Sequence, residues 1–387
     1  MVLGAGVSFR AVGKLFVEIN LHLELSLGTP THTTVLNWTK KQGVGNFREK
    51  DYFNSGEWVL IIDESIQFGN KKLLLVVAVP SDFRFEKRAV GYHDLTPLII
   101  KVSDSWKSED IARELSSHIA PDRISYAVSD NGNNLVKTFE QLKIRHMEDI
   151  NHKFSCIMQK VFENNELFIS YTKQLSGMRG KLSISRYARI VPPTQRIVSR
   201  YMNLYPVFSW GVKMLKLLET DRLTDEEKTI LSFLHDYRDF IIETHKLIEI
   251  LNSIQKLIKN NGFNKQNINM ALQSLDFLND NNAVKVKKLV KEYLFCTELK
   301  MGNFANILCS SDIIESCFGK YKELTKSNKT VGITDLSLCL SAMMCKNTEK
   351  IKNDFERIKT KDVKNWKNEN INKTLFAEKM DLSKFSA

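Results

Sequence analysis

The sequence predicts an α/β protein in which a mixed β-sheet is interrupted by an all-helical segment. Residues 57–63, 72–80 and 95–103 are short apolar runs rich in Val, Ile and Leu, as in buried strands. A fourth run of this kind, at 124–130, follows a segment with helical spacing. Residues 165–305 have helical spacing throughout, with long amphipathic stretches. We therefore expect one sheet-containing core and one helical block.

The elements of the core follow one another in a definite order. Turns containing Gly69, Pro80 and Gly91 separate the first three strands. Ser108 is expected to cap the next helix, because apolar residues recur after it at helical spacing. The remaining elements of this part are a strand at 124–130, a helix at 134–143, a short edge strand at 145–150 and an amphipathic helix at 151–162.

This order predicts a ribonuclease H-like core. The first three strands form an antiparallel meander, and the fourth returns through a helix to pair parallel with the first. Asp63 and Asp130 each close an apolar run at the C-terminal end of one of these two neighbouring strands. Ligands gather at such strand ends, although an Asp there can also simply begin a turn. Two carboxylates at equivalent ends favour a ligand site.

The chain is basic. Its 387 residues include 56 Lys and Arg against 45 Asp and Glu, a formal net charge of +11. This balance suits nucleic acid as a partner, although solvated Lys-rich faces also produce it. The six cysteines form no CxxC pair and have no His at zinc spacing, so we expect neither a zinc knuckle nor a disulfide framework. With no apolar run long enough to span a bilayer, a cytoplasmic protein is expected.

Residues 1–50 are predicted to form a helix-turn-helix DNA-binding region. Two helical patterns flank a Gly-Thr-Pro break, and Thr31 or Thr33 can cap the second helix. Val35 and Trp38 share its inward face, as in a recognition helix that enters a major groove. Too few residues precede the first helix to complete a three-helix unit, so we expect part of this region to be missing. A small helical cap is the alternative. The outward side chains that would contact DNA are His32, Asn37, Lys40 and Lys41.

The helical block contains a basic loop with two prolines. Basic side chains with aromatic neighbours can hold phosphates and stack on bases, and an ordinary solvated surface is the alternative. The basic residues of this part are Arg179, Lys181, Arg186, Arg189, Arg196 and Arg200, interleaved with Tyr187 and Tyr201.

Residues 306–345 are predicted to return to the core and to carry an acidic helix. Asp312 and Glu315 share one face of this helix, so Glu315 is either a helix N-terminal charge or a metal ligand. Lys320 and Lys322 follow and could reach a phosphate.

Three carboxylates from distant parts of the chain suit the chemistry of phosphodiester cleavage. Two Mg²⁺ or Mn²⁺ ions about 3.5–4 Å apart activate the attacking oxygen and neutralise charge on the phosphoryl and leaving-group oxygens. Mg²⁺ prefers carboxylate oxygens, so Asp63 would bridge both ions while Asp130 and Glu315 each complete one side. Glu64 is a poorer candidate because it points to the other face of its strand, and Asp312 could replace Glu315 if the helix were rotated.

Four blocks, taken in order, resemble those of bacterial insertion-sequence transposases of the DDE superfamily: WVLIIDESIQFGNKKLLLVVAV, SYAVSDNGNNLVKTF, HMEDINHKFSCIMQKVF and SSDIIESCFGKYK. The resemblance covers about residues 7–345. It implies a DNA transposase that cleaves and transfers strands with two metal ions, acting as a dimer on double-stranded DNA. By this likeness the acidic triad maps onto Asp63, Asp130 and Glu315, and His152 lies near the scissile phosphate.

The resemblance also implies a domain organisation and leaves alternatives. Other functions for such a chain are a ribonuclease H-like nuclease without strand transfer and a transposon-derived DNA-binding protein without catalysis. The chain could instead be a helical interaction scaffold, in which case the placement of the three acids would be a coincidence. The expected parts are a helix-turn-helix region at 1–50, the first part of the core at 55–164, a helical insertion at 165–305, the last part of the core at 306–345, and a polar helix and tail at 346–387.

Overall fold

The computed structural model describes residues 2–68, 71–195, 201, 203–326, 332–345 and 348–371. The chain forms two compact units. The first comprises Met1–Phe85, Ala89–Met147 and Ser310–Ala387, and the second comprises Glu86–Arg88 and Glu148–Cys309. Each unit is described by itself below.

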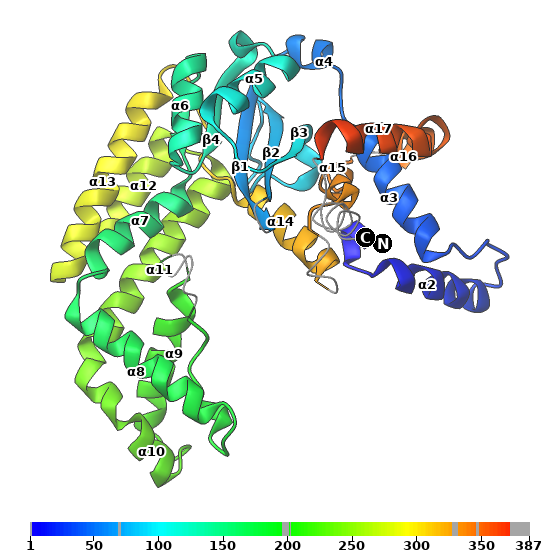
Figure 1. Cartoon of the computed structure of the whole chain (residues 1–387). Coiled ribbons are helices and arrows are strands. Elements are labelled where there is room, and N and C mark those ends of the chain that lie inside the picture. The colour runs from blue at the N-terminus through cyan, green and yellow to red at the C-terminus, as the bar shows by residue number, and fades with distance from the viewer. Residues whose placement is uncertain are drawn as a thin grey trace, which may run out of the picture. The chain divides into compact units, whose positions relative to one another are not determined.

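The first unit is built on a five-stranded mixed sheet (Figure 1). Its strands are β1 (Trp58–Phe68), β2 (Lys71–Pro80), β3 (Thr96–Ser103), β4 (Ile124–Ser129) and β5 (His146–Glu148). They lie in the order β3-β2-β1-β4-β5. The first three are antiparallel neighbours, whereas β4 pairs parallel with β1. The predicted α/β class with a mixed sheet is therefore confirmed.

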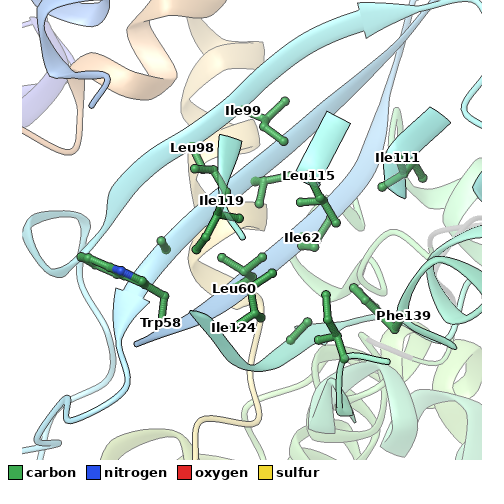
Figure 2. Packing of buried hydrophobic residues seen from close by; sticks show 14 of the residues in the cluster. Trp58, Leu60, Ile62, Leu98, Ile99, Ile111, Leu115, Ile119, Ile124 and Phe139 are labelled. Atoms are coloured by element: carbon green, nitrogen blue, oxygen red, sulfur yellow. The ribbon is translucent and has the colours of Figure 1, made fainter. Parts of the chain in front are cut away.

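One face of the sheet packs against α5 (Ser108–His118) and α6 (Asn133–Leu142). Side chains alternate along a strand, so the even-numbered Leu60 and Ile62 of β1 both enter this core. Both are fully buried. Figure 2 shows them packed with Ile111, Leu115, Ile119, Ile124 and Phe139.

Ser108 does not cap α5, so that prediction is wrong. The N-cap residue is Lys107, whose φ of −96° and ψ of 157° are extended, and Ser108 is already the first helical residue. The Ser108 hydroxyl instead donates to Oε1 of Glu109 at 3.1 Å. Glu109 and Asp110 complement the positive end of the helix in its first turn.

The acidic helix predicted near the C-terminus is α14 (Asp312–Thr325), and it contacts β1. Its buried side chains recur at helical spacing and hold it to the core. They are Ile314, Cys317, Phe318 and Tyr321.

The two terminal segments of the chain pack together within the first unit. The helix α3 (His32–Asn46) contacts three C-terminal helices, α15 (Leu338–Ala342), α16 (Thr348–Arg357) and α17 (Thr360–Asn370). Ile371, just after α17, forms a parallel bridge with Val102 of β3. Residues 372–387 of the predicted polar tail lie outside the described residues. The other short elements of this unit are α1 (Val2–Ala5), α2 (Phe9–His22), α4 (Lys50–Asn54), η1 (Tyr92–Asp94), η2 (Pro121–Arg123) and η6 (Asp335–Ser337).

Two predictions about the faces of α3 are wrong. Trp38 does not enter a core with Val35, because its side chain is 38% exposed and stacks on Phe355 of α16, with ring centroids 5.8 Å apart. Lys40 does not point outward, because its Nζ lies 2.9 Å from Oδ2 of Asp335 and its side chain is 15% exposed. The physical reason is that α15, α16 and α17 cover the second half of α3.

The second unit is helical. It begins at Glu148, earlier than the predicted residue 165, because α7 packs against α11 and α13. A cluster of aromatic rings fills its centre, with Phe208 5.5 Å from Tyr171 and 5.7 Å from Phe240 between centroids. Its helices are α7 (Ile150–Phe162), α8 (Glu166–Leu182), η3 (Ala188–Ile190), α9 (Tyr205–Leu218), α10 (Asp225–Leu231), η5 (Ser232–Tyr237), α11 (Arg238–Asn261), α12 (Lys265–Leu275) and α13 (Asn281–Met301).

No helix in the described part of the chain combines the length and apolar character that a membrane crossing requires.

Candidate active site

Asp63 and Asp130 belong to neighbouring parallel strands. The parallel register pairs Leu60 with Ala127 and Ile61 with Val128. Continued by two residues, this register brings position 63 beside position 130, where β4 has just ended. Asp63 is still within β1, opposite Leu75 of β2. The register thus brings two acidic positions side by side, but the prediction that Asp63 ends its strand is wrong, because β1 continues to Phe68.

The side chain of Asp130 shapes the turn that follows β4. Its Oδ1 accepts from the backbone N–H of Gly132 at 3.1 Å. This local bond is an Asx-turn, the kind of bond by which Asp commonly ends a strand. Beside it, the Ser129 hydroxyl donates to the Asp130 carbonyl oxygen at 2.7 Å and lies 3.0 Å from Nε2 of His146 on β5. Asp130 therefore has a defined position at the sheet edge.

Glu64, predicted to be a poorer ligand candidate than Asp63, follows it on β1. It is partly buried, and burial raises the pKa of its carboxyl, with a further contribution from the charge of Asp130. The positive charge of Lys72 and a hydrogen bond with Asn134 of α6 act in the opposite direction. The register between β1 and β2 shifts between Asp63 and Ile66, so strand alternation does not determine the face of Glu64, and Asp130 lies within its electrostatic reach.

Glu315 lies in the first turn of α14, and its side chain is exposed. The next residue, Ser316, has its hydroxyl 2.5 Å from that of Tyr92. The helix is anchored by the buried Ile314 and contacts β1, which carries Asp63. The structure therefore places Asp63, Asp130 and Glu315 in one compact unit, with Glu315 on the helix that packs against the strand of Asp63.

The donor atoms of these acids suit a hard divalent cation, because Mg²⁺ and Mn²⁺ prefer carboxylate oxygens. Oε2 of Glu64 is buried and has no hydrogen-bond partner among the described residues, as expected of an oxygen that awaits a cation or a proton. Within those same residues, however, the His, Cys, Asp and Glu side chains form no group of three or more that could hold a metal ion. The acids fit the ion by their chemistry, and their side chains do not converge in this structure.

Asp149 and His152 belong to the second unit, where they form a helix cap. The Asp149 side chain is the N-cap of α7 and accepts from the backbone N–H of His152 at 2.7 Å. Asp149 is 3% exposed, whereas the His152 side chain is partly exposed. Capping accounts for Asp149, because its side chain satisfies a backbone N–H in the first turn of the helix, whereas it does not require a His at position 152.

Two arginines predicted to bind DNA form ion pairs inside the second unit. Arg186 donates to both carboxylate oxygens of Glu226, at 2.8 and 2.7 Å. Arg189 donates from Nε to Oε1 of Glu227 at 2.6 Å and from a second nitrogen to its other oxygen. Glu227 is 3% exposed, and the Arg189 hydrogen bonds lower the pKa of its carboxyl to about 2. These pairs tie the basic loop to α10.

The other predicted DNA-contacting residues differ in their surroundings. Lys320 is partly buried, donates to the carbonyl oxygen of Leu3 at 3.3 Å and lies 4.2 Å from the centroid of the Tyr92 ring. Arg196 lies outside the described residues. His32 and Asn37 are exposed on the first half of α3, Lys41 is partly buried, and Lys322 is exposed on α14.

No protein-family model and no curated protein matches this chain. The basis for assigning a function is therefore the chemistry of its own residues on this fold.

Proposed function

We propose that the protein is a metal-dependent enzyme that cleaves and joins DNA strands, a transposase of the DDE type with a ribonuclease H-like core. The observation that carries this proposal is the parallel register of β1 and β4, which brings Asp63 and Asp130 to one sheet edge. The packing of α14 against β1 supports the third acid, Glu315. The strand order and the return of α14 to the sheet are those expected of a ribonuclease H-like core.

Each of the three acids would have its own role in holding the ions. Asp63 and Asp130 would hold the ions at the sheet edge, and Glu315 would complete the site from α14. Bound Mg²⁺ or Mn²⁺ would stabilise the charge that develops on the phosphoryl and leaving-group oxygens. Without cations the three carboxylates would repel one another, and a bound cation would offset that repulsion. Burial and the charge of Asp130 raise the pKa of the neighbouring Glu64 carboxyl, so its affinity for a proton would depend on the charge at this site.

A cleavage assay tests this proposal. Wild type, Asp63→Asn, Asp130→Asn and Glu315→Gln are incubated with Mg²⁺ or Mn²⁺ and duplex DNA that carries the sequences flanking the reading frame. Each substitution keeps the shape of the side chain and removes its charge, so each should reduce cleavage by at least about a hundredfold. Asp122→Asn is the matched control, because Asp122 is 75% exposed in a surface 3₁₀ turn and should cleave like wild type.

The products of the same reactions decide between the alternatives. A transposase joins the cleaved 3′ end to a second DNA molecule, whereas a nuclease of this fold leaves nicked or cut products alone. Equal cleavage by wild type and all three charge-removing variants would exclude catalysis by the triad, and DNA binding without any cleavage would favour a DNA-binding protein that has lost its activity. We further propose that the active form is a dimer on double-stranded DNA, which size-exclusion chromatography with and without DNA measures.

A further inference from the structure

A large groove lies within the first unit, between the N-terminal helices and α14. Its volume is about 1140 Å³, above the roughly 300–1,000 Å³ typical of ligand pockets. It is lined by Val2 and Leu3 of α1, by Phe9 of α2, and by residues between Ser316 of α14 and Lys326, the residue that follows this helix. The groove reaches Ser316, the residue that follows Glu315.

Positive side chains predominate along this groove. Arg10, Lys320 and Lys326 line it together with His32, and Glu323 is the one acid among the lining residues in the described part of the chain. Glu323 lies 3.5 Å from Lys326, but both side chains are more than 70% exposed, so this pair is weak. The charge of the groove therefore favours an anion.

Apolar side chains also reach the groove. Phe9 and Leu324 both line it, and both pack against the small core formed by Val2, Val12 and Val35. A ring beside cations is the arrangement by which proteins hold single-stranded nucleic acid, with phosphates on the cations and bases stacked on aromatic side chains. Because base stacking and phosphate contacts do not depend on sequence, such a groove accepts any strand.

We propose that this groove binds a single strand of DNA that leaves the candidate active site along α14. The inference deepens the proposed function and rests on it for the identity of the strand. Arg10 and Lys326 contact phosphates, Lys320 adds positive charge to the groove, and Phe9 stacks on a base. Lys320 already lies over the Tyr92 ring, which fixes its ammonium group at the end of the groove near Ser316.

Binding is measured by fluorescence anisotropy with a labelled oligothymidylate in EDTA, so that no metal and no cleavage are involved. Arg10→Glu and Lys326→Glu should each raise Kd at least about tenfold, and each should reduce the slope of log K against log salt by about 0.7. Phe9→Leu keeps the apolar packing but removes the ring, so it should raise Kd roughly fivefold or more with the salt slope unchanged.

Lys14→Glu is the matched control. Lys14 is exposed on α2, one turn after Arg10, and does not line the groove. Its Kd should change by less than about twofold, because a side chain outside the groove would not contact a bound phosphate directly. The groove is excluded if Lys14→Glu weakens binding as much as Arg10→Glu, or if Arg10→Glu and Lys326→Glu both bind like wild type. Binding is measured without metal, so it is independent of cleavage. Normal strand binding with no cleavage activity would overturn the proposed function but not the proposed groove. Normal cleavage without strand binding at these residues would overturn the groove alone.

Discussion

The backbone of Gly45 in α3 lies directly against the carboxylate of Asp354 in α16, and a Cβ at Gly45 would overlap that carboxylate. Asp354 is 3% exposed. The ammonium group of Lys350 lies 3.3 Å from Asp354 and donates to the carbonyl oxygen of Gly45 at 2.9 Å. This contact joins an N-terminal helix to the C-terminal segment.

Gly45→Ala should therefore destabilise the protein by about 1–3 kcal/mol, because neither the buried carboxylate nor the helix backbone can move freely. The measurement is the urea midpoint of unfolding. Gly177→Ala is the control, since Gly177 lies inside α8 with no atom within 4 Å of an added Cβ, and this change should stabilise its helix slightly. A Gly45→Ala protein as stable as wild type would contradict the close packing of α3 on α16.

Glu64→Gln should raise the thermal stability of the metal-free protein at about pH 8 by a few degrees, with little effect near pH 4. Burial and the charge of Asp130 raise the pKa of Glu64 in the folded state, so the folded protein binds its proton more tightly than the unfolded chain does. The wild-type protein therefore loses stability as the pH rises from the ordinary Glu pKa through the raised pKa of Glu64. The Glu64→Gln protein does not, because Gln carries no titratable proton in this range. Thermal unfolding in EDTA across this range measures it.

Metal binding by the Glu64→Gln variant tests whether Glu64 has a functional role in addition to its effect on stability. If Glu64 assists cation binding at the sheet edge, Glu64→Gln should weaken Mn²⁺ binding by roughly tenfold or more, the usual effect of losing a supporting group. Glu140→Gln, an exposed acid on α6, serves as the control for both measurements. An unchanged pH profile of stability would show that Glu64 lies in a wetter environment than the structure indicates.

Arg189→Ala should lower the Tm of the protein by several degrees, whereas Arg186→Ala should have little effect. Arg189 is the partner of the buried Glu227, whose carboxyl would lose its strongest hydrogen bonds. Arg186 pairs with Glu226 at the surface, where 71% and 59% of the two side chains are exposed, and such pairs contribute little. Equal Tm values for the two variants would argue against the buried pair.

The same pair predicts acid sensitivity in the second unit. The pKa of Glu227 is lowered to about 2 in the folded state, first of all by Arg189, so the folded protein binds its proton less tightly than the unfolded chain. The stabilisation is fully present above the ordinary Glu pKa and is lost as the pH falls toward 2. Wild type should therefore lose stability over this range, and Arg189→Ala should lose less, as measured by circular dichroism during acid titration.

Thiol reactivity tests the burial of the cysteines, all six of which lie in the described part of the chain. Cys156 and Cys296 are exposed, and the other four are buried. Burial raises the pKa of the Cys317 thiol to about 12, so little reactive thiolate forms there at neutral pH. Two thiols should therefore react with a thiol-specific reagent in the native protein and four more after unfolding. Rapid reaction of Cys317 without denaturant would contradict the packing of α14.

The fold was predictable where the sequence pattern is local. The strands β1 to β4 could be located because unbroken apolar runs bounded by turn residues require burial on both faces. Their order along the chain was enough to predict the parallel pairing of β4 with β1, and hence the neighbourhood of Asp63 and Asp130. The Ser108 cap was wrong because a helix start depends on the backbone angles of the preceding residue, which composition does not determine.

The sequence by itself was enough to assign Asp63 and Asp130 to neighbouring parallel strands, because the order of the apolar runs and helices restricts how the strands pair. The tertiary structure alone decided which charged side chains are available to a partner. Lys40, Arg186 and Arg189 resemble DNA-binding residues in the sequence, but each pairs with an acid from a separate segment of the folded chain. Such pairs join residues far apart in the sequence, and their attraction exists only once packing has brought them within a few ångströms and removed competing water.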